Sequence, residues 1–344
     1  MSARDSLHHE AEALRFLQAL ETNADLAREC QLTDLPGRLS ISRREAYNFS
    51  ESDLRVVVRN WDYHGTWLKW LHDGRLDTTL DDLPELTDHY LLSAEKIASF
   101  REDGHVLLPS VLSQAEVDAY RPVFRSCAAS YNPENRPVSD REFQSFLLLV
   151  NLRTRDERIA RLALGHRFGQ IAAELLGVPQ VRLYLDEGMV KERGGGTTHW
   201  HQDNLYFPFD SEKTVTMWLP LVDLSASMGT LHFASGSHKE GGLGYQPISE
   251  EAESHFAQFI DERGYQYTPG AEMSAGDATF HHGWVLHGAP PNNEERAREV
   301  YALVYYPSDA LLVDPKNIYQ ERAMNFGFIA EPGDPARSPI HPII

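Results

Sequence analysis

The chain has 344 residues, of which 42% are hydrophobic, enough apolar material for one large domain with a smaller extension. Its formal net charge of -19 disfavours DNA, RNA and anionic membranes as partners, because those surfaces select clusters of Lys and Arg. No run of about 18 apolar residues and no basic start before an apolar stretch is present, so we expect a soluble, cytoplasmic protein. The two cysteines, Cys30 and Cys127, are too few for a disulfide framework or a thiolate metal cage.

The N-terminal part of the chain, residues 1–88, predicts a helical region. Leucines recur with helical spacing over residues 11–26, and a second helix is expected over residues 50–71, where Ser50 precedes acidic residues as an N-cap does. Residues 73–88 combine Gly, Pro and clustered acidic residues, a composition typical of an exposed connection. We place a domain boundary there and expect the helices to buttress the protein or to form a homodimer.

Shorter helices are expected in the middle of the chain. Ser93 is a candidate N-cap for a helix that stops at Gly104, just before a short strand of sequence His-Val-Leu-Leu. The sequence Ser113-Gln114-Ala115-Glu116 has the form of a capping box and opens a helix through Arg121. Two more helices are expected over residues 156–164 and 167–176, the second ending at a glycine.

Short strands dominate the second half of the chain. Five segments rich in Val, Tyr, Phe, Trp and Thr are separated by Gly, Pro, Asn and Ser: residues 181–185, 214–222, 230–234, 278–282 and 300–307. Helices followed by strands, without a βαβ alternation, argue against a Rossmann sheet. We therefore predict a mainly β fold, a double-stranded β-helix of the cupin-like jelly-roll type with helical buttresses. Gly194-Gly195-Gly196 does not match phosphate-binding spacings and predicts a flexible loop.

A histidine and a carboxylate stand two residues apart in a segment that we predict to be a strand. Alternation along a strand would place His201 and Asp203 on the same face, about 6.5–7 Å apart along the backbone, where both could reach one metal ion. His199 would share that face and is a competing ligand. Only His201, however, has the spacing to Asp203 that forms a His-x-Asp pair.

A third ligand is expected far along the chain, in a predicted strand and turn. His287 with the His-x-Asp pair would form two imidazoles and one carboxylate, which leaves coordination positions open for non-haem Fe(II) and dioxygen. His281 and His282 compete for this role. Only His287 is followed by a glycine and, eleven residues later, by an arginine, so we expect the other two to support or line the pocket.

The arginine, Arg298, begins a predicted strand. A dicarboxylate that binds iron through its 2-oxo acid end still needs a fixed cation for its far carboxylate, and the guanidinium fork can bind that group in a bidentate manner. Without the three metal-binding candidates, Arg298 would be interpreted as an ordinary surface cation at the start of a strand.

Four motifs resemble one known family: LSAEKIASFREDGHVLLPSVLSQAEVDAYRP, HWHQDNLYFP, MGTLHFASGSHK and GDATFHHGWVLHG. With Arg298 they span residues 92–309 and resemble the phytanoyl-CoA dioxygenase family of Fe(II)/2-oxoglutarate oxygenases. The resemblance implies a catalytic domain over residues 92–325, followed by a C-terminal tail, residues 326–344. It assigns His201, Asp203 and His287 to the metal, and Arg298 and Trp218 to the co-substrate. Ala289 departs from the pattern, because some relatives carry there a serine that helps to hold the co-substrate.

The resemblance implies a dioxygenase that converts 2-oxoglutarate to succinate and CO2 while it oxidises an unactivated C–H bond of a small molecule, such as a natural product. Hydroxylation is the expected outcome, and desaturation, cyclisation and epoxidation remain open. Chlorination is not expected, because halogenases of the family that the sequence resembles have a small residue such as Gly or Ala in place of Asp203. The alternatives are a cupin-like metal isomerase or hydrolase, and a non-catalytic jelly-roll binding module. Tyr206, Phe207 and Phe209 would form either a substrate wall or core packing.

Overall fold

The computed structural model describes residues 12–13, 15–17, 19–20, 23–31, 35–50, 53–54, 80, 83–130, 146–328 and 330–344. The expected helix over residues 50–71 therefore lies almost wholly outside the described residues. The expected helix over residues 11–26 is wrong in its extent, because Asn23 is not helical and a new helix, α2 (Ala24–Gln31), begins after it. The side chain of Asn23 accepts a hydrogen bond from the Leu26 amide and caps α2; α3 (Leu35–Arg44) comes next.

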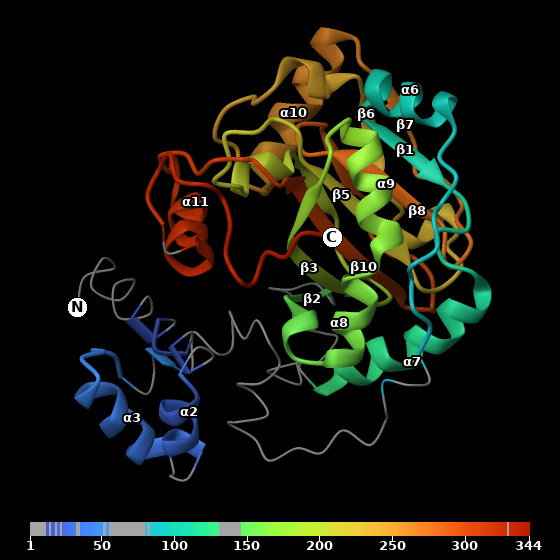
Figure 1. Cartoon of the computed structure of the whole chain (residues 1–344). Coiled ribbons are helices and arrows are strands. Elements are labelled where there is room, and N and C mark those ends of the chain that lie inside the picture. The colour runs from blue at the N-terminus through green and yellow to red at the C-terminus, as the bar shows by residue number, and fades with distance from the viewer. Residues whose placement is uncertain are drawn as a thin grey trace.

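Two antiparallel sheets form the body of the protein (Figure 1). The larger has the strand order β1 (His105–Leu108), β8 (Ala278–His282), β5 (Val215–Pro220), β10 (Arg298–Pro307), β3 (Val181–Lys191), β2 (Phe146–Val150). The smaller has the order β4 (Thr198–His201), β9 (His287–Ala289), β6 (His232–Ser235), β7 (Gln266–Thr268). Non-consecutive strands are neighbours in both sheets, which is the jelly-roll arrangement, and the predicted fold class is confirmed.

The expected strands lie where the sequence places them, but several elements differ in extent. The strand β3 continues six residues beyond the predicted end at Leu185. The strand β2 and the helix α10 (Glu250–Arg263) were not predicted. Helix α10 buries only Ala252 and Phe256, so its apolar stripe is too narrow to stand out in the sequence. It packs against β4 of the smaller sheet.

Helices cover the outer face of the larger sheet, as Figure 1 shows for α9. They are α6 (Ala94–Asp103), α7 (Gln114–Ser130), α8 (Glu157–Ala163) and α9 (His166–Leu176). Tyr120 and Phe124 of α7 and Phe168 of α9 are fully buried in one apolar cluster with residues of β5 and β8. A second cluster, which includes Trp218, Phe233 and Val300, joins strands of the two sheets. The barrel interior is therefore separate from the helical layer.

The predicted helix ends are confirmed at atomic level. The Ser93 hydroxyl accepts a hydrogen bond from the Lys96 amide, and Gly104 ends α6 with φ of 80°, a conformation that favours glycine. Ser113 and Glu116 cap each other's backbone amides at the start of α7, as the capping box predicts. This helix runs nine residues beyond the predicted end at Arg121, to Ser130.

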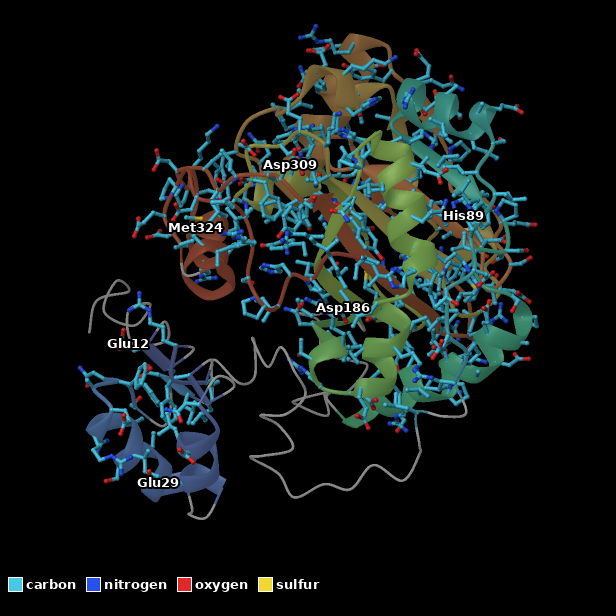
Figure 2. The ribbon with its side chains drawn as sticks, in the orientation of Figure 1. Glu12, Glu29, His89, Asp186, Asp309 and Met324 are labelled. Carbon is cyan, nitrogen blue, oxygen red and sulfur yellow. The ribbon has the colours of Figure 1, made fainter. Side chains whose placement is uncertain are left out.

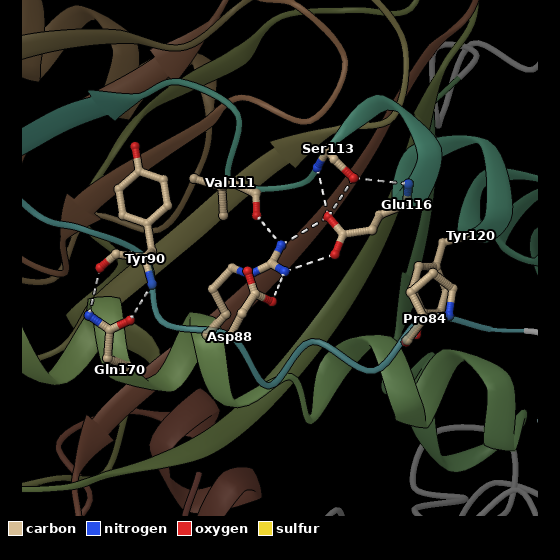
Figure 3. A network of polar contacts seen from close by, with 9 residues as sticks. Pro84, Asp88, Tyr90, Val111, Ser113, Glu116, Tyr120 and Gln170 are labelled. Atoms are coloured by element: carbon tan, nitrogen blue, oxygen red, sulfur yellow. Dashed lines mark hydrogen bonds and ion pairs between the residues drawn. The ribbon is translucent and has the colours of Figure 1, made fainter.

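The segment before α6 is bound to the helical layer, as Figure 3 shows. Arg167 of α9 forms an ion pair of 2.8 Å with Glu116 and also pairs with Asp88, while Leu83 and Leu86 are buried in the core. The prediction that residues 73–88 form an exposed connection is therefore wrong for Leu83 and Leu86, whereas Glu85, Thr87 and Asp88 are exposed. Residues 73–79 lie outside the described residues, and the division of the chain into domains stays a prediction.

The C-terminal residues also pack against the jelly roll. Arg153 forms a buried ion pair of 2.5 Å with Asp186 of β3, labelled in Figure 2, and donates to the carbonyl of Ile340 at 2.7 Å. The amide of Ile344 donates to the carbonyl of Val181 on the same strand at 3.1 Å. The expected tail, residues 326–344, therefore covers part of the larger sheet. Of the helices that are described, none combines the length and the apolar character needed to cross a membrane.

Acidification is expected to destabilise the protein through half-buried histidines. Burial lowers the pKa of His105 and of His232 from 6.5 to about 4, and that of His282 to about 3. Since the neutral form is favoured in the fold, their contribution is complete above pH 6.5 and is lost as the pH falls toward these values. At pH 5 each histidine should cost up to about 2 kcal/mol. Urea unfolding of the apoprotein between pH 7.5 and 5 measures this loss.

The matched variants for this measurement are His105→Gln and His89→Gln. The first removes one titrating group and should flatten the pH dependence, whereas the exposed His89 should leave it unchanged. A free energy of unfolding that stays constant from pH 7.5 to 5 would contradict the prediction.

Candidate active site

Two histidines face each other across the smaller sheet. His201 of β4 and His287 of β9 are directly paired in the strand register, and their ring centroids are 4.1 Å apart. Nδ1 of His201 lies 2.7 Å from the carbonyl oxygen of His199, and Nδ1 of His287 lies 3.1 Å from that of Val285. A carbonyl only accepts, so each Nδ1 carries the proton and each Nε2 presents its lone pair.

Asp203 completes a group of three, but by a route that differs from the predicted one. Strand β4 ends at His201, and Asp203 is the first residue of a 3-10 turn, η3 (Asp203–Tyr206), so the prediction that both lie on one strand face is wrong. The turn is held by Gln202, whose side-chain amide donates to the carbonyl of Trp284 at 2.6 Å. Oδ1 of Asp203 lies 3.5 Å from Nε2 of His201 and 3.6 Å from Nε2 of His287.

One potential ligand atom from each of His201, Asp203 and His287 lies within 4.8 Å of the other two. Burial alone would raise the pKa of Asp203, but the surrounding imidazoles of His287, His201 and His281 hold it well below its usual range. The group therefore consists of two imidazoles, each with a lone pair on Nε2, and one ionised carboxylate. This donor set suits a divalent first-row metal ion and leaves coordination positions open.

The second carboxylate oxygen of Asp203 is held away from the point of convergence. Its Oδ2 accepts a hydrogen bond of 2.6 Å from the Thr216 hydroxyl and lies 3.2 Å from Nε2 of His281. His281 is thus a supporting residue, in agreement with its expected role. Thr216, on β5, was not predicted, because nothing in the sequence indicates that β5 lies beside η3.

We expect Thr216→Val to weaken Fe(II) binding by about 10–100-fold without unfolding the protein, because the substitution keeps the shape but removes the donor that orients Asp203. Anaerobic Fe(II) titration measures the effect. The matched control is Thr279→Val on β8, whose buried hydroxyl makes no hydrogen bond with the described residues. Equal affinity in the two variants would show that the hydroxyl does not position Asp203.

The competing histidines point elsewhere. Between Thr198 and His201 the pairing of β4 with β9 shifts register, and Nδ1 of His199 lies 3.4 Å from the Glu253 carboxylate of α10. Because of this irregularity, the His199 side chain does not lie on the face of β4 where regular alternation would place it. Nδ1 of His282 accepts a hydrogen bond of 3.1 Å from the amide of Trp284. Neither His199 nor His282 belongs to the group of three.

Arg298 lies inside the barrel and not on the surface. It exposes 1% of its surface, its guanidinium carbon lies 5.3 Å from the centroid of the Trp218 ring, and it donates to the carbonyl of Gly229. Burial lowers the pKa of Arg298 to about 9, so the guanidinium remains a cation at neutral pH. The structure therefore brings together the two residues that the resemblance assigns to the co-substrate.

A second basic residue, Lys191, lies beside Arg298 and was missed from the sequence. The two are paired in the register of β3 and β10, and Lys191 is fully buried. Its ammonium group lies 3.3 Å from both the Thr198 hydroxyl and the Pro290 carbonyl. Burial, with the charge of Arg298, lowers the pKa of Lys191 to about 6. Lys191 lies six residues beyond the predicted end of this strand at Leu185, so the sequence did not place it on the strand.

The aromatic residues after Asp203 divide between the two predicted roles. Phe207 and Phe209 pack edge-on against Tyr184 in a buried cluster, so core packing accounts for them. Tyr206 instead contacts the ring of Tyr319 at a centroid distance of 5.0 Å, and its hydroxyl accepts a hydrogen bond from a backbone amide. Only Tyr206 remains a candidate for a substrate wall.

A family model described as Phytanoyl-CoA dioxygenase (PhyH) matches residues 100–300, more than half of the 344-residue chain. The chain belongs to the phytanoyl-CoA dioxygenase family. The match contains all of His201, Asp203, His287 and Arg298, and it confirms the family predicted from the sequence motifs.

Two curated members illustrate how the chain relates to this family. It is 27% identical over 136 residues to "Probable alpha-ketoglutarate-dependent hypophosphite dioxygenase" of Stutzerimonas stutzeri, and the matched region covers 38% of this chain and 46% of that protein. It is 29% identical over 109 residues to "Phytanoyl-CoA dioxygenase 1" of Oryza sativa subsp. japonica, and the matched region covers 32% of this chain and 38% of that protein. The chain thus spans less than half the length of either relative.

Solved structures share the fold over a larger part of the chain. The non-heme alpha ketoglutarate dependent carbocyclase SnoK from nogalamycin biosynthesis superposes with a TM-score of 0.61 at 24% identity, covering 78% of this chain and 100% of SnoK. The epimerase SnoN, solved in complex with Fe3+, alpha ketoglutarate and nogalamycin RO, has a TM-score of 0.60 at 26% identity, covering 72% of this chain and 97% of SnoN. These likenesses support the jelly-roll assignment for the family member described here.

Proposed function

We propose that this protein is an Fe(II)- and 2-oxoglutarate-dependent oxygenase that oxidises a C–H bond of a small molecule and releases succinate and CO2. The observation that carries the proposal is the convergence of His201, Asp203 and His287 on one point inside a jelly roll that also buries Arg298. When bound, iron with 2-oxoglutarate and dioxygen supplies the oxidising chemistry. The proposed catalytic domain, residues 92–325, contains all of these residues.

The three proposed ligands fit Fe(II). Backbone carbonyls orient both imidazoles with Nε2 available, and Thr216 and His281 leave Oδ1 of Asp203 available. Nitrogen and carboxylate donors suit Fe(II), whereas a thiolate suits a softer metal ion. The thiol of Cys127 is buried in the helical core and does not belong to this group.

The proposed place for the far carboxylate of 2-oxoglutarate is beside Arg298 and Lys191. Arg298 can offer its fork to a carboxylate, and the Trp218 ring restricts where the guanidinium can move. Ala289 is buried and offers no hydroxyl here, but the Lys191 ammonium lies 3.3 Å from the carbonyl of the next residue, Pro290. We assign Lys191 the supporting hydrogen bond that a serine makes in some relatives.

The surrounding residues would exclude water from the reaction. The interior cluster packs Trp218, Phe233 and Val300 together with Ala289 of β9, the strand that also carries His287. A dry wall strengthens the ionic interactions of Arg298 and Asp203, and it limits unproductive oxidation of the protein. The substrate would therefore reach the metal from the side of the site away from Arg298.

Oxygen-dependent succinate formation tests the proposal. Purified protein with Fe(II) and 2-oxoglutarate should form an anaerobic complex with a visible absorption band and, in air, should release succinate slowly even without substrate. A cupin-like isomerase or hydrolase would need neither Arg298 nor oxygen, and a binding module would release no succinate. Absence of both the absorption band and succinate would reject the proposed function.

A further inference from the structure

A carboxyl group lies on the inner face of β3, close to the proposed metal ligands. Glu187 is paired with Ala302 of β10, which belongs to the interior cluster with Trp218, so the two side chains share the inner face of the sheet. Residues Glu187, Met189 and Lys191 alternate along β3 on that face. Glu187 is also near enough to Asp203 and His201 for their charges to affect its ionisation.

Glu187 has no partner of its own in the part of the chain that the structure describes. Its neighbour Asp186, on the other face of β3, is satisfied by Arg153 at 2.5 Å and by the Tyr301 hydroxyl at 2.7 Å. Glu187 is half-buried and makes neither a hydrogen bond nor an ion pair with any described residue. A cationic ligand beside this carboxyl group would favour its charged form. Burial, with the charges of Asp203 and Asp186, raises the pKa of Glu187 to about 7.

Glu187 and Lys191 mark two ends of the interior. Four residues of strand separate them, a distance of about 13 Å. Since the proposed place of the co-substrate carboxylate is at Lys191 and Arg298, Glu187 lies at the other end, where a substrate would approach. Tyrosines lie at this end: Tyr206 ends the turn that begins with Asp203, and Tyr319 and Tyr245 lie near Tyr206. Tyr245 and Tyr319 expose 52% and 37% of their surface and can form a rim.

We propose that Glu187 binds a basic nitrogen of the substrate, so that the substrates of this enzyme are amines whose carbon skeleton packs against the tyrosine rim. The inference rests on the proposed function and adds the substrate class. An ammonium group would donate a hydrogen bond to the carboxyl group of Glu187, and its charge would reduce the repulsion between Glu187 and Asp203. A neutral hydroxyl would donate the hydrogen bond but would not reduce this repulsion. The electron-rich faces of Tyr206, Tyr245 and Tyr319 favour a cation near them, and the net charge of -19 favours its approach.

The test compares amines with alcohols of the same skeleton: phenethylamine with 2-phenylethanol, and tryptamine with tryptophol. Binding to the Zn(II)-loaded protein is measured by ligand-observed NMR, which needs no turnover. We expect each amine to bind at least tenfold more tightly than its alcohol, and Glu187→Gln to remove that preference. The matched control Glu212→Gln, at an exposed carboxylate, should keep it. Equal binding of detectable amine and alcohol, or an unchanged preference in Glu187→Gln, overturns the proposal.

If none of these amines and alcohols binds, the thermal unfolding midpoint of Glu187→Gln tests the proposal. Because Glu187 lacks a partner, Glu187→Gln should raise the thermal unfolding midpoint, whereas a structural role predicts a fall. A lower midpoint than that of the parent protein overturns the proposal. Neither measurement uses 2-oxoglutarate. A parent protein that gives no Fe(II)–2-oxoglutarate absorption band but prefers amines would therefore reject the proposed function and leave only the amine site at Glu187.

Discussion

Replacing Asp203 with alanine is expected to abolish succinate formation and to weaken Fe(II) binding by more than about 100-fold. Loss of a residue that only orients a metal ligand commonly costs about 10–100-fold, and Asp203 is one of three proposed ligands. Its carboxylate also supplies the negative charge that balances the metal ion among His201, His281 and His287. Removing it leaves these imidazoles close together, with ring centroids 4.1 Å and 4.3 Å apart, and with no anion between them.

Anaerobic Fe(II) titration of three variants tests the ligand assignment. Asp203→Ala and His201→Ala should both lose iron, and circular dichroism should show that they remain folded. His199→Ala is the matched control, because it lies two residues before His201 but contacts Glu253 of α10. Loss of iron in His199→Ala together with retention in His201→Ala would reverse the assignment of the paired ligand.

Arg298→Ala is expected to raise the KM for 2-oxoglutarate by about 100-fold while Fe(II) affinity changes less than about twofold. A bidentate hydrogen bond between charged groups is worth several kcal/mol when it is buried, and each 1.4 kcal/mol is a factor of ten. Arg298 is buried against Trp218, so little else can replace it. The variant should therefore separate co-substrate binding from metal binding.

Three further variants refine this result. Arg298→Lys keeps the charge but loses the fork, and should give an intermediate KM. Lys191→Met should raise the KM less than Arg298→Ala does, since we assign Lys191 one hydrogen bond. Arg296→Ala is the matched control, because Arg296 begins no strand and donates to the carbonyl of Asp223. An unchanged KM for 2-oxoglutarate in Arg298→Ala would remove this residue from the co-substrate site.

Much of the fold follows from local sequence signals. The Ser93 cap, the Gly104 stop and the capping box at Ser113 each depend on residues within one helical turn, and the structure has all three. Strand identity likewise follows from β-branched and aromatic composition. The order of the strands in the two sheets does not, because pairing joins segments more than a hundred residues apart, such as β1 and β8.

The sequence by itself singled out His201, Asp203, His287 and Arg298, because their spacing and surrounding motifs match one family. Only the tertiary structure decided how they meet. The pairing of β4 with β9 sets His201 opposite His287, the register shift turns His199 away, and η3 presents Asp203. Thr216, Lys191 and Glu187 came only from the structure. Each acts on a segment distant in the sequence, and the sequence of one strand carries no information about which face of which neighbour it will meet.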